Sequence, residues 1–298
     1  MTGTGAEAFE CHRAHLLGVG YRITGSLADA EDAVQEAWLR LAPDDAQAGE
    51  RPEEIRDLRG WLTTVVARLC LDRLRSAAVR RERYVGPWLP EPLVTTPEEA
   101  GPLATVVRDE GVRMAAMVVL DELSPAQRVA FVLHEALAEP FDSIAEVLGC
   151  SPASARQHAS RARRAIAEAG PPPPATDAEQ RAALGRFADA LGRGDVGALV
   201  ALLHPDVVLR NDGGGRVQAA LRPVTGPDKV ARLLLGLRER YGDGLLDGRS
   251  VLVNGEPGWL VPGAGAVTTT VTVFALSDGL VRGVFSVLNP DKLTRLPA

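Results

Sequence analysis

The sequence predicts a multidomain protein with two all-α modules, the second a helix-turn-helix, followed by a C-terminal α+β domain. Three observations support this fold class: helical apolar spacing before residue 170, four consecutive prolines, and strand-like patterns after residue 249. The prolines favour an extended spacer and end any preceding helix. The predicted boundaries are 5–85 for the first module, 86–111 for a proline-rich linker, 112–170 for the second module, 171–176 for the proline spacer and 177–298 for the third module.

The composition is that of an ordinary globular protein, with 46% hydrophobic and 24% charged residues. The longest apolar runs, such as Val271–Leu276, are far shorter than the ~20 residues that span a bilayer, and the N-terminus shows no secretory signal pattern. The three cysteines are far apart and form neither a disulfide framework nor a CxxC motif. We therefore expect a cytoplasmic protein without membrane contact, bound metal or cofactor.

The first module contains two predicted helices. Apolar residues recur along Ala30–Leu41 at helical spacing, with acidic residues on the opposite face. A second helix spans about residues 58–78, and Trp61 lies on the same stripe as Arg68 and Arg75. An aromatic face can hold an unstacked base while arginines bind the backbone. The alternative is that Trp61 only marks the edge of the core.

The second module opens with a capping box at Ser124–Gln127, in which a hydroxyl N-cap is followed by proline and glutamine. Gly149 ends a short helix over residues 142–148, and Ser151 begins another that reaches about Ala169. Two helices joined by a tight turn predict a helix-turn-helix. Arginine and glutamine at the front of the last helix could read purine edges, and later arginines could bind phosphates. The alternative is a solvated helix in an all-α domain.

Local charge points to a polyanion although the formal net charge is −6. Residues 73–83 hold five arginines and one glutamate, and residues 156–164 hold four arginines and no acid. Local charge rather than the isoelectric point is the electrostatic footprint of nucleic-acid binding.

The third module changes from helical to strand patterns. Helices are predicted around Leu184–Leu191, Val196–Leu203 and Asp228–Tyr241. Strands are predicted at residues 251–253, 267–276 and 280–288, with a hairpin turn at 277–279 between the last two. Helices first and strands later indicate an α+β domain.

Three motifs of the first two modules resemble those of sigma-70-type sigma factors of the extracytoplasmic-function class. Asp29–Trp38 resembles their core-polymerase-binding helix, Arg59–Arg75 their −10 melting and recognition helix, and Leu123–Arg163 their −35-binding region. The resemblance implies promoter-specific transcription initiation, with RNA polymerase core enzyme and promoter DNA as partners. It assigns core binding to Asp32, Gln35 and Glu36. It assigns DNA binding to Arg59, Trp61, Thr64, Arg68, Arg73, Arg75, Ser154, Arg156, Gln157, Ser160, Arg161, Arg163 and Arg164.

Three further segments resemble signatures of the sigma-factor group that carries a fused SnoaL-like domain: Tyr84–Leu93, Asp212–Arg216 and Asn289–Leu293. Arg216 departs from the lysine usual in that group but keeps the charge. The resemblance implies a SnoaL-like cone with a curved antiparallel sheet, which acts in cis in place of a separate anti-sigma factor. The expected regulatory residues are Trp88, Leu89, Pro90, Asp212, Gly213, Gly214, Gly215, Arg216, Asn289, Pro290, Asp291, Lys292 and Leu293.

Three alternatives compete with this hypothesis. SnoaL-like folds include cyclases, and His204, Asp206, Asp212 and Asp243 are candidate bases, but none pairs with a convincing oxyanion donor; we therefore predict a chain that is not an enzyme. The third module could instead sense a small molecule without chemistry. A one-component regulator would use the helix-turn-helix and the sensory domain but would leave the first module without a role.

Overall fold

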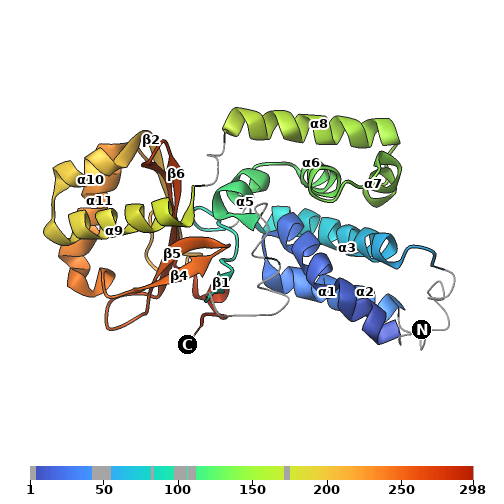
Figure 1. Ribbon diagram of the computed structural model, residues 1–298, viewed down its shortest axis with the longest axis horizontal. Coiled ribbons are helices and arrows are strands. Elements are labelled where there is room, and N and C mark those ends of the chain that lie inside the picture. Colours follow the sequence, from blue (N-terminus) through green and yellow to red (C-terminus); the bar gives the residue numbers. More distant parts are fainter. Residues whose placement is uncertain are drawn as a thin grey trace. The chain divides into compact units, whose positions relative to one another are not determined.

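The computed structural model describes residues 5–41, 55–81, 84–96, 106, 112–170 and 175–297 (Figure 1). The chain forms two compact units. The first contains residues 1–82, 100–112 and 116–170, and the second contains residues 83–99, 113–115 and 171–298. Part of the predicted linker therefore belongs to the same unit as the C-terminal domain.

The first unit begins with three packed helices, α1 (Gly5–Thr24), α2 (Leu27–Leu41) and α3 (Leu58–Arg81). The apolar stripe predicted for α2 is buried, which leaves its acidic side chains outside. Gly20 allows α1 and α2 to cross closely, because a Cβ there would lie 2.9 Å from the Cβ of Ala30. No pattern in the sequence predicted α1.

The helix-turn-helix region consists of α5 (Met114–Asp121), α6 (Pro125–Phe131), a π-helical turn (Val132–Ala136), α7 (Phe141–Leu148) and α8 (Pro152–Ala169). The capping box at Ser124 is confirmed, and Ser151 caps α8 by accepting a hydrogen bond from the Ser154 amide. Gly149 ends α7 in the left-handed conformation, with φ of 66°. Small buried alanines on α8 let it pack against α6 and α7.

A buried arginine joins the two sigma-like modules of the first unit. Arg128 of α6 is 1% exposed, donates through Nε to the Arg22 carbonyl at 3.0 Å and pairs with Asp121 at 2.9 Å. Helix α3 also contacts α6 and α7. The two modules are therefore packed against each other in this structure.

The second unit is an α+β domain in which helices lie against one side of a seven-stranded sheet (Figure 1). The helices are α9 (Asp177–Arg193), α10 (Val196–Leu202) and α11 (Pro227–Tyr241). The strands are β1 (Val94–Thr95), β2 (Leu203–Asp212), β3 (Val224–Thr225), β4 (Arg249–Val253), β5 (Glu256–Val261), β6 (Thr270–Ser277) and β7 (Leu280–Val287). Their order in the sheet is β1-β4-β5-β6-β7-β2-β3.

The sheet is mixed, whereas a wholly antiparallel sheet was expected. Strand β2 runs parallel to β7, and the remaining pairs are antiparallel. Parallel neighbours need a long crossover connection, and α11 with β3 to β6 provides it between β2 and β7. The β6–β7 hairpin was predicted, and Asp278 and Gly279 both have the positive φ that a tight type I′ turn requires.

Strand β1 comes from the predicted linker rather than from the third module. Val94 pairs with Val253 and Thr95 with Leu252, which adds an edge strand to the sheet of the C-terminal domain. Within the described ranges, no helix has both the length and the apolar character needed to cross a bilayer.

Candidate functional site

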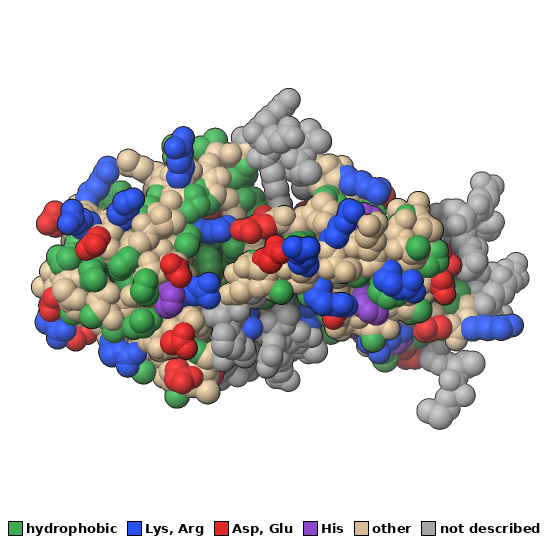
Figure 2. Space-filling model, turned by 90° about the horizontal axis from the view of Figure 1, so that it is seen from above, with side chains coloured by type: hydrophobic (Ala, Val, Ile, Leu, Met, Phe, Trp, Pro, Cys, Tyr) green, Lys and Arg blue, Asp and Glu red, His purple; other side chains and the backbone are tan. Residues whose placement is uncertain are grey.

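The solvent face of α8 carries the seven residues predicted to bind the −35 element. Gln157 and Arg161 are exposed, and Arg156 lies over the Phe141 ring, 5.0 Å from its centre. Arg163 and Arg164 each pair with a glutamate, Glu135 and Glu168 respectively. Figure 2 shows acidic side chains among the cationic ones on this face. Ser154 and Ser160 complete the face, which combines charge with hydrogen-bonding groups.

On helix α3, some of the predicted DNA-binding residues already contact other protein groups. Arg68 donates to the Glu146 carbonyl of α7 at 3.2 Å, and its Nη2 lies 3.8 Å from the Glu146 carboxylate. Arg75 pairs with Asp72 at 3.5 Å, and Trp61 and Thr64 are half-buried. Part of this face is therefore in contact with the helix-turn-helix.

Arg59 begins α3 beside a histidine that carries no charge at neutral pH. Its Nη2 lies 3.4 Å from Nδ1 of His15, whose other ring nitrogen is hydrogen-bonded to Thr63 at 3.0 Å. Burial, assisted by the neighbouring arginine, lowers the pKa of His15 to about 4. The positive charge at this end of α3 therefore comes from Arg59.

The predicted polymerase-binding residues lie on the outer face of α2. Asp32 and Gln35 are exposed, while Glu36 is half-exposed and pairs with Arg40 at 2.6 Å and with Arg73 at 3.6 Å. A residue predicted to bind polymerase and one predicted to bind DNA therefore meet at the edge of α2 and α3.

In the second unit, Asp212 at the end of β2 binds the linker. One carboxylate oxygen accepts from the Tyr84 hydroxyl at 2.5 Å, and the other accepts from the Leu89 amide at 2.8 Å and from Lys292 Nζ at 2.7 Å. Lys292 also donates to the Leu89 carbonyl, and Asn289 donates to the Tyr84 hydroxyl at 3.0 Å. We call these five residues, together with Trp88, the linker clasp.

The centre of the linker clasp is buried, and its charges are compensated. Asp212 is 0% exposed and the Lys292 side chain is 13% exposed. Lys292 Nζ lies 4.0 Å from the centre of the Trp88 ring, which adds a cation–π contact. Burial, and then the hydrogen bond to Asp212, raises the pKa of Tyr84, so its hydroxyl remains a donor. A buried carboxylate is tolerated when donors surround it in this way.

The glycines that follow Asp212 are required because neighbouring side chains approach their backbone closely. A Cβ on Gly214 would come within 2.3 Å of Asn289 Nδ2, and one on Gly215 within 3.0 Å of the Val85 Cβ; both glycines have positive φ. At the rim, Arg216 pairs with Asp291 at 3.2 Å, and both side chains are more than half exposed. The structure thus brings together the three segments predicted to be regulatory. Gly213 and Pro90 are buried in it, Pro290 opens a short 3₁₀ turn, and Leu293 follows that turn half-buried.

Further linker anchors had not been predicted. The side-chain oxygen of Asn254 accepts a hydrogen bond from the Leu93 amide at 3.0 Å. The backbone N–H of Asn254 donates to the Leu93 carbonyl at 2.9 Å. Arg113, at the start of the second module, lies 3.7 Å from Glu256, which also accepts from Gln180. Local sequence patterns could not predict these contacts, because the partners are far apart in the chain. Arg113 and Glu256 are separated by 143 positions, and Leu93 and Asn254 by 161.

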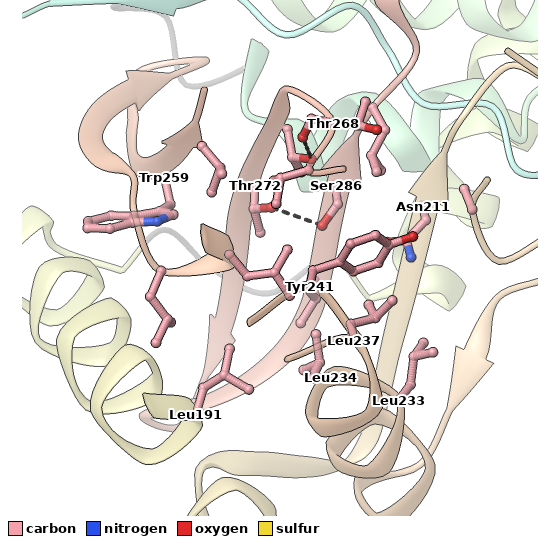
Figure 3. A pocket seen from close by; sticks show the side chains of 18 of the residues that line it. Leu191, Asn211, Leu233, Leu234, Leu237, Tyr241, Trp259, Thr268, Thr272 and Ser286 are labelled. Atoms are coloured by element: carbon pink, nitrogen blue, oxygen red, sulfur yellow. Dashed lines mark hydrogen bonds between the residues drawn. The ribbon is translucent and has the colours of Figure 1, made fainter. Parts of the chain in front are cut away.

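The second unit also contains a cavity of about 410 Å³ between its helices and its sheet (Figure 3). Leucines of α9 and α11 form much of its wall, and none of the described residues that line it is an aspartate, glutamate, histidine or lysine. The four candidate bases, His204, Asp206, Asp212 and Asp243, are absent from the wall. A carboxylate base in this cavity, which the enzyme alternative requires, is therefore lacking among these residues.

Comparison with known families assigns three parts of the chain. The Sigma-70 region 2 family matches residues 8–80, the Sigma-70 region 4 family matches residues 113–166, and the SnoaL-like domain family matches residues 184–284. The chain is therefore a sigma-70-type factor with a fused SnoaL-like domain.

Comparison with individual proteins narrows this class. The chain is 49% identical to the ECF RNA polymerase sigma factor SigJ of Mycobacterium tuberculosis, over 97% of this chain and 93% of that protein. It is 36% identical to the probable ECF RNA polymerase sigma factor SigI of the same species, over 77% of this chain and 76% of that protein. The crystal structure of SigJ matches with a TM-score of 0.82 at 47% identity, covering 97% of this chain and 98% of that one. The chain belongs to the ECF RNA polymerase sigma factors.

Membership of this family confirms the predicted function, promoter-directed transcription initiation. Sigma factors are specificity subunits rather than enzymes, which agrees with the prediction for this chain. Membership of the family also assigns a role to the first module, which a one-component regulator would leave unused.

Proposed function

We propose that this sigma factor engages core polymerase through α2 and promoter DNA through α3 and α8, and that its C-terminal domain controls this engagement in cis by holding the linker. The polymerase contact would use Asp32, Gln35 and Glu36, whose side chains lie outside the buried stripe of α2. The proposed partners support a cytoplasmic location.

The two DNA faces would have different tasks. On α8, Gln157 and Arg161 are exposed and suited to base edges and phosphates in the major groove. On α3, Trp61 and its neighbouring arginines would hold the opened strand, with binding energy offsetting a few kcal/mol of unstacking per flipped base. Contact of Arg68 with Glu146 supports a closed form, since Nη2 of this side chain is already engaged by α7 and fewer of its donors are left for a phosphate.

The observation that carries the regulatory part is the buried Asp212. Its carboxylate accepts from Tyr84 just before the linker, from the Leu89 amide of the linker and from a lysine of the C-terminal tail, and so joins three segments that are distant in the sequence. Arg113 is held by Glu256, so the linker is anchored at its far end as well. Anchoring at both ends limits how far the two sigma modules can separate to reach two promoter elements.

Promoter-dependent transcription with core polymerase tests this proposal. Asp212→Asn weakens the linker clasp, and we expect it to raise transcription severalfold, whereas Arg216→Ala at the exposed rim serves as the control and should stay near the unmodified level. A chain that ends before Asn289 should also be more active, and one that ends near Pro174 should be less active. Equal activity of the unmodified chain, Asp212→Asn and both truncations would overturn control in cis.

A further inference from the structure

The cavity of the second unit has the properties of a ligand site rather than of a packing defect. Its volume of about 410 Å³ falls within the roughly 300–1,000 Å³ typical of small-molecule pockets. Figure 3 shows leucines of α9 and α11 facing polar side chains of the sheet across it. An apolar wall with a few convergent polar groups is the usual composition of such sites.

The polar groups of the wall indicate what the cavity would accept. Asn211 is only 9% exposed, and its side chain lines the cavity. Thr272 and Ser286 also line it but are hydrogen-bonded to each other at 2.9 Å. The Asn211 amide can both donate and accept a hydrogen bond, so it offers a molecule in the cavity one polar contact.

Charge excludes ionic ligands from the interior. Arg240 is the one charged residue among the described lining residues, and it is exposed and stacked on the neighbouring Tyr241 ring. A fully charged molecule would lose its hydration here without gaining a buried counter-ion. The chemistry of the wall therefore favours a neutral and largely apolar molecule with an oxygen or nitrogen for Asn211.

We infer that this cavity binds an uncharged, predominantly apolar small molecule that hydrogen-bonds to Asn211, and that its occupancy is coupled to the linker clasp. The regulatory half of this inference rests on the proposed control in cis; the binding half does not.

The coupling follows from neighbouring residues on two strand ends. Asn211 lines the cavity and the next residue, Asp212, holds the linker; Leu288 lines the cavity and the next residue, Asn289, belongs to the clasp. Successive side chains of a strand point to opposite faces, so one backbone segment serves both sites. The amides of Leu288 and Asn289 both donate to the Asp212 carbonyl, at 2.8 and 2.9 Å, which ties the two ends together.

Binding of the neutral fluorophore N-phenyl-1-naphthylamine to the full chain tests the site. We expect a saturable rise in fluorescence with one site per chain. Leu237→Trp fills the cavity from α11 and should weaken binding at least tenfold, and Leu233→Phe should weaken it less. Glu239→Trp, an exposed position on the same helix, is the matched control and should bind as the unmodified chain does. Absence of saturable binding, or equal binding by all variants, would overturn the site.

Tyr84→Phe tests the coupling, because it removes one hydroxyl of the linker clasp and leaves the cavity wall intact. By reciprocity of linked sites, we expect it to weaken fluorophore binding by about 2- to 30-fold. Unchanged affinity in this variant would reject the coupling. The titration contains neither polymerase nor DNA, so its failure is separate from a failure of Asp212→Asn to change transcription.

Discussion

Cationic side chains have opposite environments in the two units of this protein. Lys292 of the second unit is largely buried and contacts Asp212, the Leu89 carbonyl and the Trp88 ring. Arg161 on α8 of the first unit is exposed, and no acidic partner is described for it. Burial, rather than charge alone, therefore distinguishes a cation that stabilises the fold from one that is available to a phosphate.

The largest expected effect comes from removing the buried cation. Lys292→Met leaves the Asp212 carboxylate buried without its counter-ion, and should lower the free energy of unfolding of the second unit by about 3–5 kcal/mol. Lys229→Met is the matched control, because the other lysine of the chain is exposed on α11, and it should cost less than about 0.5 kcal/mol. Chemical denaturation measures both, and similar losses in the two variants would contradict a structural role for Lys292.

A buried acid, Glu256, makes the stability of the second unit depend on pH. Burial raises the pKa of Glu256 to about 7 from an ordinary 4.5, although Arg113 acts in the opposite direction. The folded state therefore holds this proton more tightly than the unfolded state does, and the associated stability is complete below about pH 4.5 and lost as pH rises through about 7.

At about 1.36 kcal/mol per pKa unit, this effect amounts to at most about 3.4 kcal/mol. Denaturation of the unmodified chain and of Glu256→Gln between pH 5 and pH 8 isolates it, since other titrating groups are common to both. The free energy of unfolding of the unmodified chain, relative to that of Glu256→Gln, should fall as pH rises from 5 to 8. A difference that stays constant over this range would refute the raised pKa.

Removal of the exposed cation should affect promoter binding without affecting the fold. Arg161→Ala should weaken the holoenzyme–promoter complex by about 1–2 kcal/mol and reduce its salt dependence. Its free energy of unfolding should change by less than about 0.5 kcal/mol. Arg186→Ala, at an exposed position on α9, is the control and should leave promoter affinity unchanged. Equal promoter affinity of the two variants would remove Arg161 from the DNA face.

The smallest effect is expected at the rim of the linker clasp. Arg216 and Asp291 come from the same two signatures as Asp212 and Lys292, but both of their side chains are more than half exposed. Arg216→Ala should therefore change the free energy of unfolding by less than about 1 kcal/mol. A loss as large as that of Lys292→Met would show that the rim and the buried pair are not energetically distinct.

Local patterns predicted the helices that carry their own signals. The bounds of α3 and α8 follow from apolar spacing, and the N-caps at Ser124 and Ser151 follow from a hydroxyl placed before a proline. The tight turn at Asp278–Gly279 could also be predicted from the sequence, because few residue pairs tolerate positive φ at both positions.

Elements that depend on distant partners were missed. Strand β5 begins Glu256–Pro257–Gly258, which as a local pattern predicts a turn, and it is a strand because β4 and β6 pair with it. Strand β1 is two residues long and owes its conformation to β4. The contact between Tyr84 and Asp212 joins residues 128 positions apart, so only the resemblance to a family pointed to those segments.

The distance between the two sigma modules tests the central claim, that the linker clasp keeps them together. The chain offers two native labelling sites, Cys11 on α1 and Cys150 after α7, while Cys70 is buried and its pKa is raised to about 12, which leaves it unreactive. Spin labels on Cys11 and Cys150 should give one narrow distance distribution in the unmodified chain and a longer, broader one in Asp212→Asn. Identical distributions in the two chains would contradict the account.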